Sequence, residues 1–260
     1  MQIHTLRSIN IVPKRNGKRS LQGATGFICS SASSEFFALV TNRHVVFPLN
    51  PETGHPLGDL GGAPDAIDLV IPSISKSQFF GYRTVEVPLC LHGDVGQALW
   101  TDHPSKSLSV DIAAVKIPAD ICDPSLLVDI SGQPEGPIKF GAPPDQVFAP
   151  TTQLFVVGYP LGLSGPNATA VWTSAFVASE YGNLDRDYFL VDSRTRSGNS
   201  GSPVYKFSLS GNLSPSGGIV NQGRPDAQFA GIYSGRLHKD SDVGKVWKHH
   251  LVAEVVNQLT

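Results

Sequence analysis

The sequence is poor in cysteine, in charge and in long apolar runs, and each shortage excludes a class of protein. Three cysteines in 260 residues (Cys29, Cys90 and Cys122) leave at least one thiol unpaired, and their spacing matches no zinc motif. No apolar run approaches the ~20 residues of a membrane-spanning helix. A net charge of −2 lacks the basic surplus that is typical of nucleic-acid-binding proteins. We therefore expect no membrane insertion and no nucleic-acid partner.

Signals for secretion and for metal binding are also missing. Residues 1–20 lack the apolar core of a secretion signal, and together with free thiols this predicts a cytoplasmic location. His92, Asp94, Asp102 and His103 are the candidate metal ligands, but their spacing supports no known site. The sequence therefore predicts neither a metal nor another cofactor.

Glycine and proline, by contrast, are plentiful, with 26 and 20 residues. They separate many short apolar runs, a pattern that is typical of strands joined by turns. At the C-terminus, apolar residues at 247, 251, 255 and 259 fall one per turn, which predicts a helix over 246–260. We therefore expect an all-β sandwich or barrel followed by a C-terminal helix.

The stretch 196–203 places Asn199 and Ser200 between Gly198 and Gly201. Glycines permit a sharp turn from which a serine hydroxyl can project into a cleft. The backbone amides of Gly198 and Ser200 could then stabilise an oxyanion. The alternative is an ordinary Gly/Ser-rich hairpin turn, and this stretch alone does not decide between them.

Two polar residues lie at buried strands, and each also has two interpretations. His44 follows the apolar run 36–40, where it is either a hydrogen-bonded core residue or a base. Asp111 interrupts the apolar run 110–117 and either faces water at a strand edge or orients an imidazole. Burial of an unpaired carboxylate would cost roughly several kcal/mol, so a buried Asp111 would need a partner.

Together, His44, Asp111 and Ser200 supply a base, an orienting acid and a nucleophile. Their surroundings resemble the three catalytic blocks of trypsin/chymotrypsin-like serine proteases, in that family's order. The variants are closest to its bacterial branch, which includes HtrA-type proteases and glutamyl endopeptidases. The three blocks are Thr-Asn-Arg-His-Val-Val at 41–46, Val-Asp-Ile-Ala-Ala-Val at 110–115 and Gly-Asn-Ser-Gly-Ser-Pro-Val at 198–204.

The resemblance covers roughly residues 20–260 and implies one peptidase domain, 1–260, without a PDZ domain. It implies two six-stranded antiparallel β-barrels with the cleft between them. His44 and Asp111 would come from the first barrel and Ser200 from the second. The implied parts are an N-terminal barrel at about 1–125, a C-terminal barrel at about 150–245 and a terminal helix at 246–260.

The resemblance also implies a serine endopeptidase that forms an acyl-enzyme with protein or peptide substrates. Gly198 and Ser200 would form the oxyanion hole, and Ser234 would bind Asp111 and begin the strand that pairs with substrate. Arg194 replaces the acid of trypsin, so we expect no Lys/Arg specificity. Either Arg194 or Arg236 would favour an acidic side chain, unless both face solvent. The implied substrate-binding residues are Arg194, Thr195, Tyr233, Ser234, Gly235 and Arg236.

Two alternatives to a constitutive protease remain open at this point. One is a catalytically silent module that binds a peptide or a partner, and the other is a protease that stays latent until a regulatory partner activates it. The start lacks the Ile-Val-Gly-Gly activation sequence, and Asn199 replaces the aspartate that would pair with a freed N-terminus. Activation by the trypsin route is therefore not expected.

Overall fold

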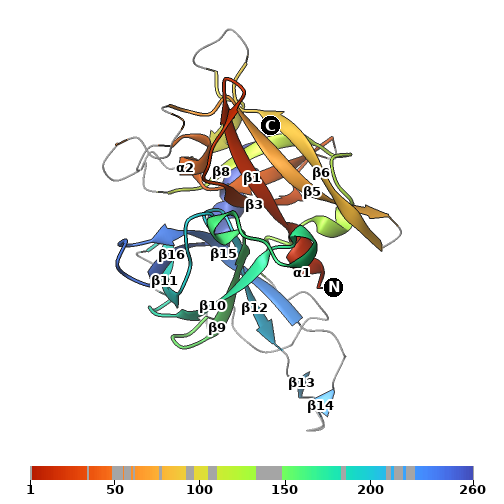
Figure 1. The fold of residues 1–260 in the computed structure, drawn as a ribbon. Coiled ribbons are helices and arrows are strands. Elements are labelled where there is room, and N and C mark those ends of the chain that lie inside the picture. Colours follow the sequence, from red (N-terminus) through yellow and green to blue (C-terminus); the bar gives the residue numbers. More distant parts are fainter. Residues whose placement is uncertain are drawn as a thin grey trace.

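The computed structural model describes residues 2–33, 35–48, 55, 60, 62–75, 78–91, 97–104, 110–132, 148–182, 186–208, 212–213, 219–220 and 226–259. The chain folds into two halves built from β-sheet, which lie one above the other in Figure 1. The first half contains the strands up to β8, and the second half contains those from β9 onward. The C-terminal helix packs against strands of both halves.

The first half is an antiparallel sheet in the order β6-β5-β1-β3-β4-β8-β7, with β2 paired to β1. The prediction of a closed six-stranded barrel is wrong here, because the described strands form an open sheet of eight. One isolated bridge, between Cys90 and Ala98, joins the segments next to the two end strands of the sheet, β6 and β7. The strands are β1 (Ser8–Arg15), β2 (Lys18–Arg19), β3 (Ala24–Ser30), β4 (Phe36–Thr41), β5 (Ala66–Ser75), β6 (Gln78–Pro88), β7 (Trp100–Asp102) and β8 (Ala113–Pro118).

The second half is a closed antiparallel barrel in the order β10-β11-β16-β15-β12-β9, which confirms one six-stranded barrel. Residues 188–193 alternate between less buried and buried positions, as a strand that lines a barrel core should, and 153–156 do the same. The strands are β9 (Gln153–Gly158), β10 (Val171–Val177), β11 (Tyr188–Ser193), β12 (Pro203–Ser208), β15 (Asp226–Arg236) and β16 (Val243–Lys248), with a separate hairpin of β13 (Asn212–Leu213) and β14 (Ile219–Val220).

The C-terminal helix is present but begins three residues later than predicted. Val246 and Trp247 lie in β16, opposite Tyr233 and Ile232, so the helical spacing of residue 247 is coincidental. None of the helices in the described ranges is long and apolar enough to span a bilayer. The helical segments are α1 (Ile3–Arg7), α2 (Arg43–Val46), η1 (Pro124–Leu126), η3 (Pro160–Gly162), η4 (Pro166–Ala168) and α3 (His249–Val256).

Two stretches of the first half differ from what their own sequence predicts. Apolar residues between 3 and 13 predict a single strand, but residues 3–7 form α1. The stretch 49–72 is rich in proline, glycine and aspartate, which predicts a long loop with a solvated Asp68, but it contains the start of β5. There Asp68 is buried, and Lys14 Nζ and Arg19 Nη2 lie 3.4 and 2.6 Å from its carboxylate oxygens. These cations supply the partners that a buried carboxylate requires.

A shared hydrophobic core fixes the two halves to each other. It combines Phe27 and Val40 of the first half with Tyr205 and Phe229 of the second, and α3 adds Leu251. Burial on this scale makes the interface between the halves a rigid place for a functional site.

Candidate active site

A single helical turn at the end of β4 carries His44. Val45 and Val46 of this turn are buried and anchor it against the first-half core. The amide Nδ2 of Asn42, just before the turn, donates a 2.7 Å hydrogen bond to the carbonyl oxygen of Asp111. His44 is thereby held beside the segment that leads into β8, with 21% of its side chain exposed.

Asp111 is buried, with 4% of its side chain exposed, so it is not a strand-edge residue facing water. His44 Nδ1 donates to Asp111 Oδ2 at 2.7 Å, and the backbone N–H of His44 donates to Oδ1 at 3.0 Å. Ser234 Oγ donates a third hydrogen bond, 2.6 Å long, to Oδ2. The carboxylate is therefore satisfied by three donors, as burial requires.

The pKa values of this pair move apart. Burial opposes protonation of His44, but the charge and hydrogen bond of Asp111 outweigh it and raise the pKa of His44. Burial alone would raise the pKa of Asp111, but His44 and the hydrogen bonds from His44 and Ser234 lower it below its usual range. Because Nδ1–H donates to Asp111, Nε2 of the neutral imidazole is left as a proton acceptor.

Ser200 lies in the turn between β11 and β12, where two glycines have positive φ. Gly198 has a φ of +94° and Gly201 a φ of +85°. A Cβ on Gly201 would lie 1.9 Å from the carbonyl oxygen of Thr25, so this position excludes any side chain. The N–H of Thr25 donates to the carbonyl oxygen of Ser200 at 2.9 Å, which ties the turn to β3.

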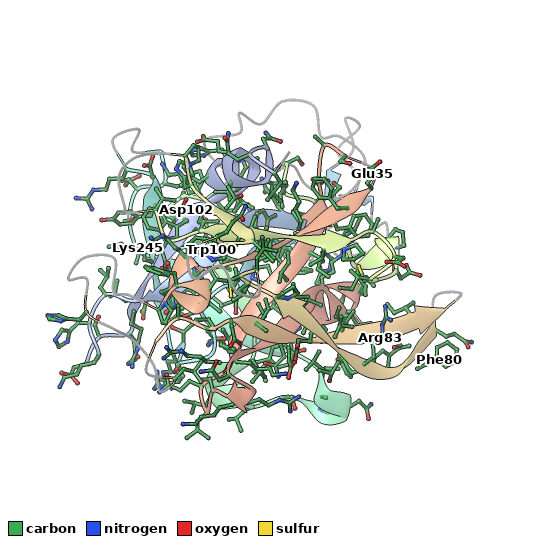
Figure 2. All side chains as sticks on the ribbon, turned by 90° about the horizontal axis from the view of Figure 1, so that it is seen from above. Glu35, Phe80, Arg83, Trp100, Asp102 and Lys245 are labelled. Carbon is green, nitrogen blue, oxygen red and sulfur yellow. The ribbon has the colours of Figure 1, made fainter. Side chains whose placement is uncertain are left out.

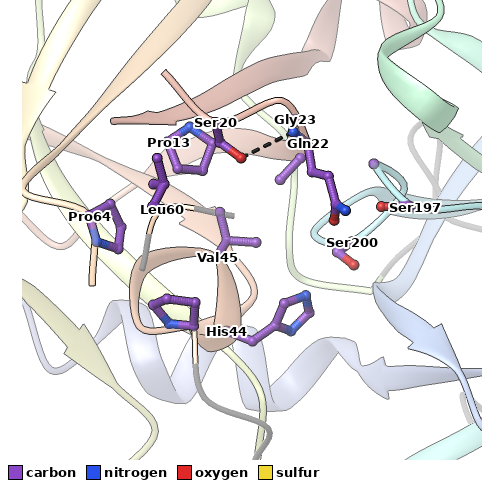
Figure 3. Close-up of a pocket in the computed structure, with 13 residues that line it drawn as sticks. Pro13, Ser20, Gln22, Gly23, His44, Val45, Leu60, Pro64, Ser197 and Ser200 are labelled. Atoms are coloured by element: carbon purple, nitrogen blue, oxygen red, sulfur yellow. Dashed lines mark hydrogen bonds between the residues drawn. The ribbon is translucent and has the colours of Figure 1, made fainter. Parts of the chain in front are cut away.

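His44 and Ser200 line the same cavity and face a common space in Figure 3. The hydroxyl of Ser200 donates a long hydrogen bond, 3.5 Å, to the carbonyl oxygen of Ser234. Within the described residues no hydrogen bond joins this hydroxyl to His44. Catalytic hydrogen bonds of free enzymes are often loose and tighten in the substrate complex.

The backbone next to Ser200 presents two free donors. Within the described part of the chain, the N–H groups of Gly198 and Ser200 donate no hydrogen bond. The neighbouring carbonyl groups are held by other residues, since Leu161 N–H donates to Ser197 O at 2.6 Å and Thr25 Oγ1 donates to Gly198 O at 2.7 Å. The two amides are thus available to an oxygen of a ligand.

The residues expected to bind the substrate side chain divide between surface and interior. Arg194 is exposed, and 234–236 are partly exposed at the end of β15. Thr195 and Tyr233 are buried, and the Tyr233 hydroxyl forms a hydrogen bond with Thr195 Oγ1. These two side chains therefore contact each other in the barrel rather than solvent. The part of all six residues in substrate binding stays a prediction.

Charges of both signs act on the buried Tyr233 hydroxyl. Burial and the charge of Asp242 raise the pKa of Tyr233, while the hydrogen bond with Thr195 and the charges of Arg236 and Arg196 oppose the rise. Arg196 Nη1 lies 3.5 Å from a carboxylate oxygen of Asp242, so its charge is partly compensated. Among the described residues, Arg236 has no such partner. This edge of the site therefore carries positive charge.

Further contacts support the turn that carries His44. Arg43 Nε donates to Asp102 Oδ2 at 3.1 Å, and its guanidinium lies 5.0 Å from the ring centre of Phe47 and 5.9 Å from that of Trp100. Figure 2 shows Trp100 and Asp102 close together on β7. Arg43 thus links α2 to the edge strand of the sheet.

The residues considered as metal ligands have other contacts or lie outside the described ranges. Asp102 binds Arg43, and His103 Nε2 lies 2.9 Å from Glu254 Oε2 of α3. His92 and Asp94 lie outside the described residues. In the described ranges, no three His, Cys, Asp or Glu side chains gather closely enough to hold a metal ion.

Sequence reasoning missed Thr25 and a cavity of about 100 Å³ that opens beside the catalytic candidates. Both depend on contacts between residues far apart in the chain, and the only local signal is the Gly-Ala-Thr-Gly stretch at 23–26. The residues that line the cavity are Pro13, Ser20, Gln22, Gly23, Ala24, His44, Val45, Pro48, Leu60, Pro64, Ser197, Gly198 and Ser200.

Comparison with protein families gives one match, which covers most of the chain. Residues 24–212 match the family described as the trypsin-like peptidase domain. This range contains His44, Asp111 and Ser200. No curated protein matches the chain.

Solved structures share the fold at low sequence identity. A serine endoprotease from Yersinia pestis is 15% identical with a TM-score of 0.54, and the match covers 100% of this chain and 66% of that one. The HtrA-type protease AlgW, solved with a tripeptide, is 15% identical with a TM-score of 0.53, covering 98% and 60%. The chain thus spans about two thirds or less of these two proteins.

Proposed function

The chain belongs to the family of trypsin-like peptidase domains, and we propose that it is a serine endopeptidase that cleaves protein or peptide substrates. The observation that carries the proposal is the buried His44–Asp111 pair, joined at 2.7 Å beside Ser200. Burial of the Asp111 carboxylate costs free energy, and this carboxylate holds the His44 imidazole with Nε2 facing the cavity that Ser200 lines. Such an arrangement suits acyl transfer.

In the proposed reaction, Ser200 Oγ attacks the carbonyl carbon of the scissile bond and His44 Nε2 takes its proton. Asp111 keeps the imidazole in the required tautomer and stabilises the imidazolium. The free N–H groups of Gly198 and Ser200 donate to the oxyanion. His44 then protonates the departing amine, and a water molecule, deprotonated by His44, hydrolyses the acyl-enzyme.

We propose that a rotation of the Ser200 side chain brings the hydroxyl to this geometry. Ser200 Oγ would turn from the Ser234 carbonyl oxygen toward His44 Nε2. The bond it leaves is 3.5 Å long and therefore weak, so the rotation costs little. A substrate that occupies the cleft and excludes water would favour the hydrogen bond between Ser200 Oγ and His44 Nε2.

The acyl side of the substrate would bind along the end of β15. Residues 234–236 offer backbone groups next to Ser200, where an extended peptide can add as a strand. The side chain before the scissile bond would then lie near Arg236, which has no carboxylate partner among the described residues. We therefore propose that the site favours an acidic side chain at that position.

The second candidate function is a latent protease or a silent, partner-binding module. The missing Ser200–His44 hydrogen bond favours it, because a regulatory partner could complete the pair. The buried Asp111 and the free amides are costly for a module with no chemistry to perform, and for that reason we place it second.

Casein cleavage and hydrolysis of a short ester distinguish these possibilities. We expect the wild-type protein to cleave casein and the Ser200→Ala variant, matched in fold, to leave it intact. Ester hydrolysis without casein cleavage would identify an acyl hydrolase instead. A folded wild-type protein that is inactive on both substrates would contradict the proposal and favour the latent or silent alternative.

A further inference from the structure

We propose that the cavity beside His44 and Ser200 is an apolar recognition pocket for the side chain that directly follows the scissile bond. The pocket would make the residue on the leaving-group side a determinant of cleavage. This inference rests on the proposed function, and it names the class of substrate that the site selects. Figure 3 shows the cavity with its lining residues.

The cavity begins at the catalytic candidates and continues into the first half of the molecule. Ser197, Gly198 and Ser200 of the serine turn form one wall. The other walls come from β1, from the approach to β3, from α2 and from the connection between α2 and β5. In Figure 3, the amide of Gln22 points toward Ser197 at the edge of this space. The cavity is therefore continuous with the site of attack.

The chemistry decides which part of the substrate enters this space. His44 must deliver a proton to the departing amine, so the leaving group lies against His44. The proposed acyl side runs along residues 234–236, and the Ser234 carbonyl oxygen receives the hydrogen bond of Ser200 Oγ. None of the described residues that line the cavity comes from 194–196 or 233–236. The cavity thus lies on the leaving-group side.

Much of the cavity wall is apolar and stiff. The larger apolar residues that line it are Pro13, Val45, Pro48, Leu60 and Pro64, and the lining side chains in the described ranges include no Asp, Glu, Lys or Arg. Proline rings lose little conformational entropy on binding, so such a pocket is largely preformed. An apolar wall without a charge disfavours a charged side chain, which would be desolvated without a partner.

The volume limits the size of the occupant. The cavity holds about 100 Å³, which is less than the roughly 150 Å³ apolar cavity that accommodates benzene. A side chain of the size of valine, leucine or isoleucine fits this space, and glycine or alanine would leave it unfilled. Differences of one or two methylenes in apolar pockets change kcat/KM by about 10- to 100-fold.

The test is a digest of a mixed peptide library in which the new N-termini are sequenced by mass spectrometry. Each new N-terminus reports the residue that followed the scissile bond. We expect Leu, Ile and Val to be enriched about 10-fold or more over Asp, Lys and Gly. Cleavage without this enrichment would overturn the pocket alone, whereas no cleavage at all would overturn the proposed function and the pocket with it.

Leu60→Arg tests the assignment of the pocket directly. It should transfer the enrichment from apolar residues to Asp and Glu, which a loss of structure could not do. Phe80→Arg is the matched control because it adds the same charge at an exposed position. Phe80 is 68% exposed and lies near the tip of the β5–β6 hairpin in Figure 2. An equal shift in both variants, or none in Leu60→Arg, would overturn the inference.

A second variant covers the case in which Leu60→Arg does not fold. Leu60→Ala enlarges the pocket without adding a charge. The preference should then move from leucine toward phenylalanine and other larger apolar residues. An unchanged order of preference in a folded Leu60→Ala protein would contradict the pocket.

Discussion

Thr25 Oγ1 donates a 2.7 Å hydrogen bond to the carbonyl oxygen of Gly198, across the interface between the two halves of the molecule. The same oxygen accepts from the N–H of Tyr159 at 3.1 Å, and the N–H of Thr25 donates to Ser200 O at 2.9 Å. A strand of the first half therefore positions the serine turn of the second. This hydroxyl holds the carbonyl end of the peptide between Gly198 and Asn199, whose N–H donates to Arg196 O at 3.1 Å.

Replacing Thr25 by valine should weaken catalysis and stability together. The variant keeps the shape of the side chain but leaves the Gly198 carbonyl and the Tyr159 N–H buried without partners, at about 1–3 kcal/mol for each group. We expect kcat/KM to fall by about 10- to 100-fold and the thermal midpoint to drop. Thr25→Ser retains the hydroxyl and should keep most of the activity. Equal activity of the valine and serine variants would contradict this role.

Gly198 and Gly162 form a matched pair for testing the oxyanion turn. Both have positive φ, but a Cβ on Gly198 would lie 2.3 Å from Tyr159 O, whereas one on Gly162 meets nothing within 4 Å. Gly198→Ala should displace the amide and reduce kcat by about 10²- to 10³-fold. Gly162→Ala should cost about 1 kcal/mol of stability and leave kcat nearly unchanged. Similar kcat values for the two variants would argue against an oxyanion role for Gly198.

The pH profile of kcat/KM should report the raised pKa of His44. Only the neutral imidazole accepts the proton of Ser200, so kcat/KM should increase as the pH rises through the pKa of His44. The inflection should lie at a higher pH than the ordinary pKa of histidine. Asp111→Asn removes the charge that raises this pKa and leaves burial, which lowers it. In that variant the inflection should shift downward and kcat/KM should fall by about 10⁴-fold, the size of this effect in a Ser-His-Asp triad. An unshifted inflection would contradict the pairing.

Arg236 should determine which residue precedes the cleaved bond. In the peptide-library digest, we expect Glu or Asp to be enriched before the scissile bond, because Arg236 lacks a carboxylate partner in the described structure. Arg236→Gln should remove this enrichment, whereas Arg196→Gln should change it less, since Arg196 already faces Asp242. Preference for large apolar residues in the wild-type digest would contradict an acidic specificity.

The catalytic candidates were accessible from the sequence because each lies in a short block with its own local chemistry. Glycines around Ser200 and an acid within an apolar strand are visible without a structure. The all-β class and the terminal helix also followed from apolar patterning, whereas the six-stranded barrel followed from the family resemblance. Pairing between distant strands does not follow from local pattern, which explains why the open first sheet and the strand assignment of Trp247 were missed.

Contacts between segments that are distant in the sequence could not be predicted either. Thr25 and Gly198 are 173 residues apart, and the cavity combines Pro13 with Ser197. Asp68 looked like a solvated charge because nothing in its own stretch reveals Lys14 and Arg19 as partners. Such features depend on the packed fold rather than on neighbouring residues.

Labelling with a fluorophosphonate probe tests most directly the claim that Ser200 is a nucleophile activated by His44 and Asp111. The wild-type protein, Ser200→Ala and His44→Ala would be treated under the same conditions, and mass spectrometry would locate the adduct. We predict one adduct at Ser200 in the wild type and none in either variant. A folded wild-type protein that stays unlabelled, or that is labelled at another residue, would contradict an assembled catalytic site.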